Sequence, residues 1–296
     1  GINVGNLGYY FAPSEYWDAT LRATLRERGG VLLDSRFVYT VRNRLNGSAN
    51  FSFENGTLSA RSTRNWRLNL SHQQRLSSTL NIRGSGNFTS SASFDQSNSY
   101  DLYQFLNQQL RSSFSMDKRW PEANRSLDAN LTYYRDLTRS QNRFQGFPRL
   151  SFRQGRRPVF GRPKDGSNRG WHRSIYYGFS GDFDNDFTRD PDPANNINDL
   201  SFGTSLFLNS QQRPFRWLDF TPSVAVNQTS SQNNRNLPTR RESYTASVSS
   251  GTTLYGIFRP RVGRLRGIRH RLQPRIDFRY SQSARVEGGT FGFGGN

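Results

Sequence analysis

The stretch GYYFAPSEYWDATLRATLRERGG, residues 8–30, decides the fold class of this protein. Within it every second residue from position 17 to position 25 is apolar, namely Trp17, Ala19, Leu21, Ala23 and Leu25. Polar residues occupy most of the positions between them. A period of two residues is typical of a β-strand with one apolar face. Such a face packs either on a water-soluble core or against lipid, and the remainder of the chain decides between the two.

The same alternation recurs along the whole chain. In the next run, VLLDSRFVYTVR at 31–42, the apolar side carries Val31, Leu33, Phe37, Tyr39 and Val41. Further alternating runs are found at 45–53, 65–72, 79–90, 109–120, 125–136, 146–153, 171–187, 198–210, 214–229, 241–256 and 267–281. The pattern predicts about thirteen strands. Many of these runs have the length of about 9–11 residues that a tilted strand needs to cross a bilayer.

The segments between the runs are expected to be turns and loops. RGG at 28–30 and ENG at 54–56 predict tight turns. The segments 154–170 and 188–199 are longer and polar, and they predict long outer loops. The segment 99–111, SYDLYQFLNQQLR, has apolar residues at helical spacing and predicts a short helix or an irregular lead-in.

The composition agrees with a membrane β-barrel. Hydrophobic residues make up 33% of the chain and mean hydropathy is −0.83, yet aromatic residues reach 14%, which is more than disordered chains carry. A barrel strand alternates lipid-facing apolar residues with polar lumenal residues, so its mean hydropathy resembles that of a soluble protein. No run of about 18 apolar residues is present, which excludes a membrane-spanning helix. We therefore predict an all-β fold, an antiparallel transmembrane β-barrel with long outer loops.

The charge of the chain indicates an anionic partner. The formal net charge is +19, and all but two of the 41 basic residues are arginines. Arginine binds phosphate and carboxylate through two parallel hydrogen bonds, so both anionic lipid and nucleic acid fit. The basic stretches RRPVFGR at 156–162 and RPRVGRLRGIRHRLQPR at 259–275 would also suit a nucleic-acid groove, but no nucleic-acid-binding motif accompanies them.

No motif for catalysis or for metal binding is complete. The chain has no cysteine, and the three histidines, His72, His172 and His270, are widely separated. DFDND at 182–186 has the spacing of a calcium loop, but Phe187 stands where that loop requires glycine. GRPKDGSN at 161–168 lacks the lysine of a phosphate-binding loop. We expect no catalytic residue, no metal site, no cofactor and no enzymatic activity.

Three strings of this sequence resemble a known family in their order and spacing. They are NLGYYFAPSEYWDATLRATLRERGG at 6–30, TTLYG at 252–256 and IRHRLQPRIDFRYS at 268–281. Together they resemble the barrel of the lipopolysaccharide-assembly outer-membrane proteins (LptD, also called OstA), in the form found in Bacteroidetes-like bacteria. The more specific positions are Tyr255 and Gly256 in the second string and Arg269, His270 and Pro274 in the third.

The resemblance implies a fold, a location and a set of partners. It implies that residues 1–296 form one domain, the N-terminal part of a larger barrel in the outer membrane of a Gram-negative bacterium. A periplasmic jelly-roll domain before it and closing strands after it are expected to lie outside this sequence. The implied partners are lipopolysaccharide, a lipoprotein that plugs the lumen, a periplasmic lipopolysaccharide-bridge protein and membrane lipid, and nucleic acid is not among them. The cysteines that some family members carry are absent, so no disulfide is carried over.

A lateral gate is implied by the resemblance, and Pro13 gives it a physical basis. In the family the first and last strands part to release the lipid sideways. Pro13 is predicted to lie at the start of the first strand, where it offers no backbone N–H to a neighbour. At roughly 1 kcal/mol for each lost hydrogen bond, it would loosen the gate without abolishing it. We predict that Pro13, Tyr16 and Asp18 belong to the gate, the alternative being a proline that simply begins a strand.

Five arginines are predicted to line the hydrated interior of the barrel. Arg22, Arg36, Arg42, Arg67 and Arg83 share the polar side of their strands. We expect them to guide phosphorylated sugar headgroups while acyl chains leave through the gate. The predicted function is insertion of lipopolysaccharide into the outer leaflet. The alternatives are another outer-membrane barrel, such as a porin-like channel, and, less favoured, a soluble basic protein that binds nucleic acid.

Overall fold

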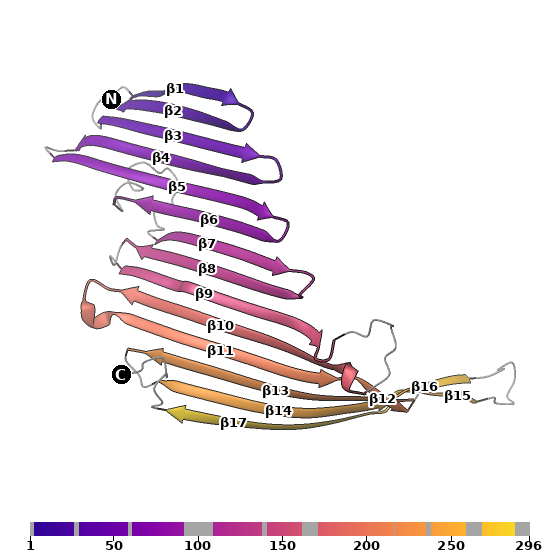
Figure 1. The fold of residues 1–296 in the computed structure, drawn as a ribbon. Coiled ribbons are helices and arrows are strands. Elements are labelled where there is room, and N and C mark those ends of the chain that lie inside the picture. Colours follow the sequence, from indigo (N-terminus) through magenta and orange to yellow (C-terminus); the bar gives the residue numbers. More distant parts are fainter. Residues whose placement is uncertain are drawn as a thin grey trace.

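The computed structural model describes residues 3–26, 30–58, 61–91, 109–137, 141–161, 171–215, 217–234, 238–258 and 268–287. These residues form one large antiparallel sheet and a two-stranded extension of it (Figure 1). Apart from two short 3-10 helices, η1 (Trp171–Ser174) and η2 (Pro193–Asn195), the regular structure in these ranges is strand. None of the helices that they contain is long and apolar enough to span a membrane.

The strands of the large sheet follow one another in the order of the chain. Each pairs antiparallel with its neighbour, from β1 at one edge to β17 at the other (Figure 1). The strands of the first part are β1 (Asn3–Ser14), β2 (Trp17–Arg26), β3 (Gly30–Val41), β4 (Leu45–Leu58), β5 (Arg61–Ser77), β6 (Leu80–Thr89), β7 (Gln109–Trp120), β8 (Arg125–Asp136) and β9 (Gln141–Pro158). The remaining strands are β10 (Ile175–Arg189), β11 (Ile197–Ser210), β12 (Gln212–Phe215), β13 (Leu218–Asn233), β14 (Thr239–Thr252), β15 (Leu254–Phe258), β16 (Ile268–Leu272) and β17 (Arg275–Glu287).

The alternating runs of the sequence correspond to these strands, and the all-β prediction is confirmed. The predicted runs 109–120 and 125–136 coincide with β7 and β8. Two of the later runs, 241–256 and 267–281, each contain two strands because the chain breaks at Thr253 and at Gln273–Pro274. The described residues therefore contain seventeen strands, against the thirteen or so expected.

Three local predictions either need correction or concern residues that the structure does not describe. The opening stretch is a hairpin, because a turn at Glu15–Tyr16 separates β1 from β2. The predicted turn ENG at 54–56 is wrong, since pairing of β4 with β5 runs through it to Leu58 opposite Arg61. Most of the segment 99–111 lies outside the described residues, and its last three residues are strand.

The long loops do not gather at one end of the strands. The connection after β9 begins at the same end of the sheet as the short turns at 15–16 and 42–44, whereas the connection between β10 and β11 lies at the opposite end (Figure 1). The loop predicted at 154–170 begins later than expected, because β9 extends to Pro158, and residues 162–170 lie outside the described ranges. The loop predicted at 188–199 is shorter than expected, because β10 ends at Arg189 and β11 begins at Ile197. The two connections leave the sheet at opposite ends. Only one of the two can be an outer loop.

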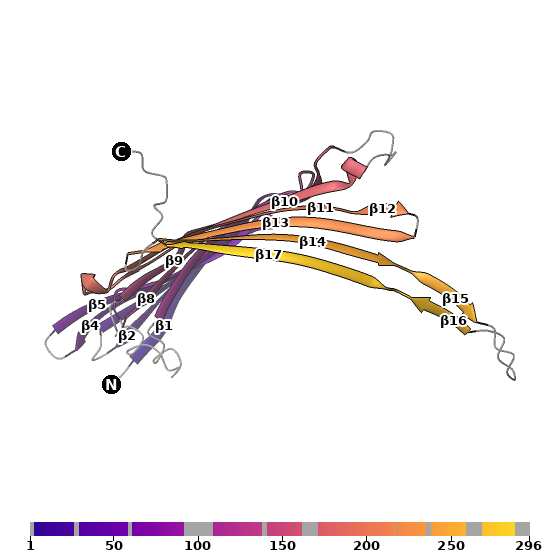
Figure 2. The same ribbon diagram turned by 90° about the horizontal axis from the view of Figure 1, so that it is seen from below.

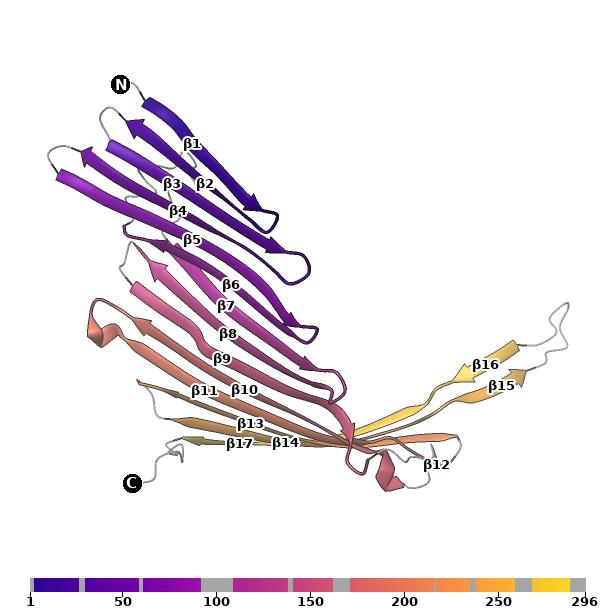
Figure 3. The same cartoon turned by 45° about the horizontal axis from the view of Figure 1, so that its top comes forward.

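The sheet is strongly curved and open. Figures 2 and 3 show its strands turning progressively from the first to the last, with β1 and β17 at separate edges. Within the described ranges β1 pairs only with β2, and in the large sheet β17 pairs only with β14. Hairpin β15–β16 continues β14 and β17 outward and projects past the end of the sheet (Figure 2). The backbone N–H of Thr252 donates to the carbonyl of Pro274 at the base of this hairpin, over 3.1 Å.

Candidate functional site

The sheet has one apolar face that nothing in the described structure covers. Cross-strand pairing aligns the apolar residues of successive strands, so that Ala23 lies opposite Leu33, Leu33 opposite Phe53 and Phe53 opposite Trp66. The same alignment continues at the other edge, where Leu208 lies opposite Val224. Among the described apolar side chains only Leu110 is buried, and Phe278 is 66% exposed. An apolar surface of this extent needs a hydrophobic environment.

Aromatic rings gather at both ends of this apolar face. At the end with the 15–16 turn, Phe11, Trp17, Phe37, Tyr39 and His72 form a row in which neighbouring ring centroids are 5.6–5.8 Å apart. At the opposite end a second cluster contains Tyr133, Phe144, Phe147 and Phe187, and the rings of Phe144 and Phe187 stack at 4.3 Å. Two aromatic girdles that flank an apolar band are typical of strands that cross a membrane.

The length of the apolar band agrees with a membrane crossing. Trp17 and Leu25 mark its two ends on β2. At about 3.4 Å per residue their Cα atoms are roughly 27 Å apart along the strand. A barrel strand tilts by about 35–45°, which reduces this to about 20 Å across the bilayer, close to the ~25 Å band of outer-membrane barrels.

The opposite face is polar, and it brings two of the predicted lumenal arginines together. Arg22 on β2 lies directly opposite Asp34 on β3, and Arg36 on β3 lies opposite Asn50 on β4. These residues line a polar hollow of about 260 Å³. The hydroxyl of Ser52 donates to Asp34 Oδ1 over 2.5 Å and holds the carboxylate in this hollow. The hollow therefore presents two guanidinium groups around one anchored carboxylate, which suits an anion with several oxygens.

The other three predicted arginines are dispersed. Arg67 on β5 shares the polar face and lies opposite Ser52. Arg83 on β6 also shares it, and its Nη1 lies 3.8 Å from Asp117 Oδ2. For Arg42 the predicted strand position is wrong, because this residue lies in the turn between β3 and β4. The alternation of the strand ends at Val41, and Asn43 takes a positive φ of 61° to reverse the chain.

The alternating carboxylates of DFDND also lie on the polar face, at β10. Asp182 Oδ1 accepts from the hydroxyl of Ser151 over 2.6 Å, and Asp184 forms an ion pair with Arg149. Asp186 Oδ1 accepts from the backbone N–H of Gly146 over 2.5 Å. In the part of the chain that the structure describes, no group of three or more His, Cys, Asp or Glu residues could hold a metal ion. These carboxylates are engaged by groups of the neighbouring strand β9.

The predicted gate residues lie at the first hairpin, but not as expected. Pro13 is near the end of β1 instead of its start, in a register shift between Phe11 and Ser14 where proline is tolerated. Tyr16 lies in the turn, where its backbone N–H donates to Ser14 Oγ over 3.2 Å. Asp18 is on β2, opposite Val38 of β3, and is therefore one strand away from the edge. Of the three, Pro13 alone is on the edge strand.

The residues of the two remaining family strings meet in hairpin β15–β16. Gly256 lies opposite His270, and the guanidinium carbon of Arg269 lies 5.1 Å from the ring centroid of Tyr255. Pro274 follows β16 and accepts the hydrogen bond from Thr252 that closes the base of the hairpin. The sequence separates these strings by more than ten residues, and antiparallel pairing places them side by side.

Comparison with known proteins gives one family. The family model described as LptD protein matches residues 1–286. Among the curated proteins no match was found. A solved structure, described as a bacterial polysaccharide outer membrane secretin, is 10% identical with a TM-score of 0.32. That likeness covers 93% of this chain and 88% of the other.

Proposed function

This chain belongs to the LptD protein family, and on that premise we propose that it forms part of the outer-membrane barrel that inserts lipopolysaccharide into the outer leaflet through a lateral gate. The observation that carries the proposal is the division of one continuous sheet into an uncovered apolar face and an arginine-bearing polar face. A barrel built from this sheet would turn the apolar face to lipid and the polar face to water.

The two-faced sheet argues against a soluble protein. A soluble sheet with one apolar face covers it with a second layer, and no such layer is present in the described ranges. Large exposed apolar patches mark sites of contact with membranes or other proteins. A soluble basic protein that binds nucleic acid therefore fits this structure less well than a membrane barrel.

The polar face supports the handling of phosphorylated sugars. Arg22 and Arg36 share one polar hollow, and each guanidinium can bind a phosphate through two hydrogen bonds. Arg67 and Arg83 extend the positive charge over β5 and β6. A face with several arginines can pass an anionic headgroup from one to the next without holding it tightly. Transfer of this kind breaks no covalent bond, and we expect no enzymatic step.

The gate is proposed along the outer edge of β1. Within the described residues this strand has one partner, β2, and Pro13 removes a backbone donor near its end. The proposed partners are those of the family: lipopolysaccharide as substrate, a lipoprotein in the lumen and a periplasmic bridge protein that delivers the lipid. Hairpin β15–β16 and the polar face are the parts of this chain that could contact such proteins.

Site-specific photo-crosslinking in the intact protein tests this proposal. A photoreactive residue at position 50 would probe the polar face and one at position 51 the apolar face of the same strand, β4. We expect adducts with lipopolysaccharide from position 50 and adducts with phospholipid from position 51. A porin-like channel would give phospholipid adducts from position 51 and no lipopolysaccharide adduct from position 50. A soluble protein would give neither and would purify without detergent.

A further inference from the structure

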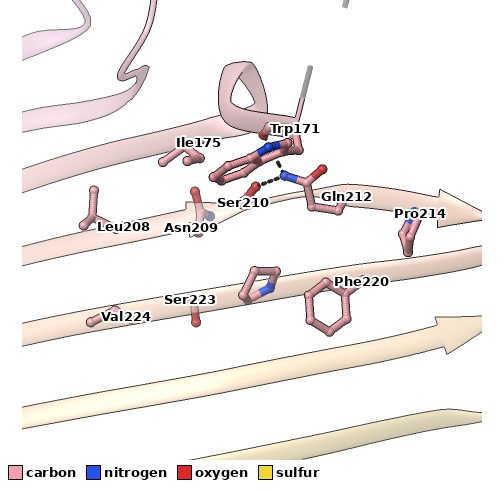
Figure 4. Close-up of a pocket in the computed structure, with 11 residues that line it drawn as sticks. Trp171, Ile175, Leu208, Asn209, Ser210, Gln212, Pro214, Phe220, Ser223 and Val224 are labelled. Atoms are coloured by element: carbon pink, nitrogen blue, oxygen red, sulfur yellow. Dashed lines mark hydrogen bonds between the residues drawn. The ribbon is translucent and has the colours of Figure 1, made fainter. Parts of the chain in front are cut away.

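The apolar face contains a hollow near the end that carries hairpin β15–β16. Its volume is about 670 Å³, within the range of pockets that hold small ligands (Figure 4). The apolar residues that line it come from η1, β10, β11, β12 and β13, and they are Trp171, Ile175, Leu208, Pro214, Phe220, Pro222 and Val224.

Strand register places this hollow on the apolar face of the sheet. Leu208 lies opposite Val224, and Gln212 lies opposite Phe220. Leu208 also lies opposite Tyr177 of β10, and Tyr177 has the same parity as Phe179 and Phe183 of the apolar face. The hollow is therefore continuous with the apolar band, and the arginines of the polar face lie on the other side of the sheet.

A break in one strand lies at the hollow. β11 ends at Ser210, β12 resumes the pairing with β13 at Gln212 in the same register, and a register shift follows between Gln212 and Phe215. Pro214 lies within β12 and has no backbone N–H for the ladder. The sheet thus loses regular packing at this point, and a depression remains between η1 and β13 (Figure 4).

A small hydrogen-bond cluster fixes the wall of the hollow. The side-chain amide of Gln212 donates toward the carbonyl of Trp171 over 2.8 Å and toward the hydroxyls of Ser174 and Ser210 over 2.6 Å each. The Ser174 hydroxyl also donates to the Trp171 carbonyl over 2.8 Å. These bonds tie η1 to β12, and they hold the indole of Trp171 beside the hollow (Figure 4).

We propose that this hollow binds one acyl chain of a bilayer phospholipid. None of the residues that line it is charged. A neighbouring cation, Arg213, is paired with Asp219 over 2.5 Å. The lining of the hollow therefore offers no cation to a phosphorylated headgroup. It does offer apolar contacts along the length of a hydrocarbon chain. Trp171 marks the membrane boundary, where its ring contacts the chain and its backbone is held by polar groups.

This proposal rests on the membrane-facing side of the proposed function and not on lipid export. The bound chain would fill a depression in the apolar surface of the sheet, against Leu208, Phe220 and Val224. Packing of a hydrocarbon chain against these side chains gains dispersion contacts that an empty depression lacks. A tightly held lipid is thus expected to stabilise this part of the barrel.

Native mass spectrometry of the full-length protein tests the site. The protein would be reconstituted in nanodiscs of phosphatidylcholine, of phosphatidylglycerol or of phosphatidylcholine with lipopolysaccharide, and then transferred to mild detergent. We expect one retained phospholipid, with little preference between the two headgroups. Val224→Trp fills the hollow and should reduce retention at least about tenfold, because each excluded methylene is worth a severalfold change in affinity. The matched control, Leu70→Trp, adds the same ring on the apolar face of β5, outside the hollow.

Each outcome decides the proposal. Equal retention by wild type and Val224→Trp would overturn it, as would retention only when lipopolysaccharide is present. Heat-modifiable gel mobility reports whether the variant has folded. If it has not, Trp171→Ala removes the exposed wall of the hollow and should reduce retention in the same way. Because neither variant touches the arginines of the polar face, lipid export should persist in both, and loss of the bound lipid with normal export leaves the proposed function intact.

Discussion

Arg26 on β2 donates a hydrogen bond of 3.1 Å from Nη1 to the buried carboxylate of Glu54 on β4, across the intervening strand β3. β3 begins opposite Arg26 with Gly30, so no side chain at that position separates the two groups. Glu54 is 5% exposed on the polar face. The pair joins three strands at one end of the sheet.

Glu54→Ala should destabilise the barrel through loss of this pair. The substitution removes the acceptor of the hydrogen bond from Arg26 in a largely buried ion pair, and the expected cost is about 1–3 kcal/mol. Urea unfolding followed by heat-modifiable gel mobility would measure it. The control is Asp219→Asn, because the pair of Asp219 with Arg213 is exposed and worth ~0–1 kcal/mol. Equal stability of both variants would contradict the structural role of Glu54.

Gly47→Ala should disturb the aromatic row at the end of the apolar face. A Cβ at position 47 would lie 2.2 Å from the Tyr39 hydroxyl oxygen and 2.5 Å from the backbone oxygen of Ser71. Tyr39 Oη bonds His72 Nδ1 over 2.5 Å, and the substitution would displace it. We expect a loss of about 1–3 kcal/mol in unfolding free energy. Gly84→Ala is the control, because its Cβ would meet only ordinary contacts at 3.9 Å.

These contacts show which parts of the structure could be predicted from the sequence. Alternation of apolar and polar residues predicts the strands and their two faces, because the period of two along a strand does not depend on which strands lie beside it. It could not pair Tyr39 with His72, which are 33 residues apart, or Arg26 with Glu54, since both pairs depend on strand register. ENG at 54–56 has the local chemistry of a turn, yet Asn55 pairs with Arg64 and Gly56 with Thr63. Cross-strand pairing and the ion pair of Glu54 outweigh the local turn preference.

The first hairpin could not be predicted from the sequence either. Glu15 and Tyr16 form its turn, and neither is a residue that usually marks a two-residue hairpin loop. Without this turn the sequence predicts that Pro13 begins a strand, whereas it lies near the end of β1. Parity predicts that Arg22, Arg36, Arg67 and Arg83 share the polar face, and the strand pairing puts them there. That this face lines the lumen stays a prediction, and the strand position predicted for Arg42 is wrong because parity has no meaning inside a turn.

Arg22 and Arg36 should act together in export. Arg22→Gln and Arg36→Gln are each expected to slow lipopolysaccharide export less than about twofold, and the double variant about fivefold, as for exposed charge contacts worth up to ~1 kcal/mol. Asp34→Asn should speed lipopolysaccharide export, because it removes the carboxylate that competes with an anionic headgroup for Arg22. Arg42→Gln in the turn is the control. Export in cells would be followed by appearance of lipopolysaccharide at the surface, and an unchanged double variant would contradict the role of the polar hollow.

Tyr255→Ser should loosen hairpin β15–β16. The contact between the Arg269 guanidinium and the Tyr255 ring is exposed, and such contacts are worth about 0.5–1 kcal/mol. Opening of the hairpin should become about two- to fivefold more frequent. Limited trypsin digestion with mass mapping would detect this as faster cleavage after Arg269 and Arg271. Tyr255→Phe keeps the ring and should behave as the wild type, and faster cleavage in that variant would exclude the ring contact as the cause.

Pro13→Ala should slow lipid export by strengthening the edge of β1. The alanine restores one backbone N–H near the Glu15–Tyr16 turn, and one added hydrogen bond is worth about 1 kcal/mol, or roughly fivefold in the population of an open edge. The added hydrogen bond has its effect at an edge strand, because an interior strand already has partners on both sides. Pro222→Ala within β13 is therefore the matched control, since β13 pairs with both β11 and β14. Export rate and sensitivity of the outer membrane to large antibiotics would be measured in cells that carry the intact protein. Slower export with Pro13→Ala and normal export with Pro222→Ala would locate the gate at β1, whereas normal export in both would place it elsewhere.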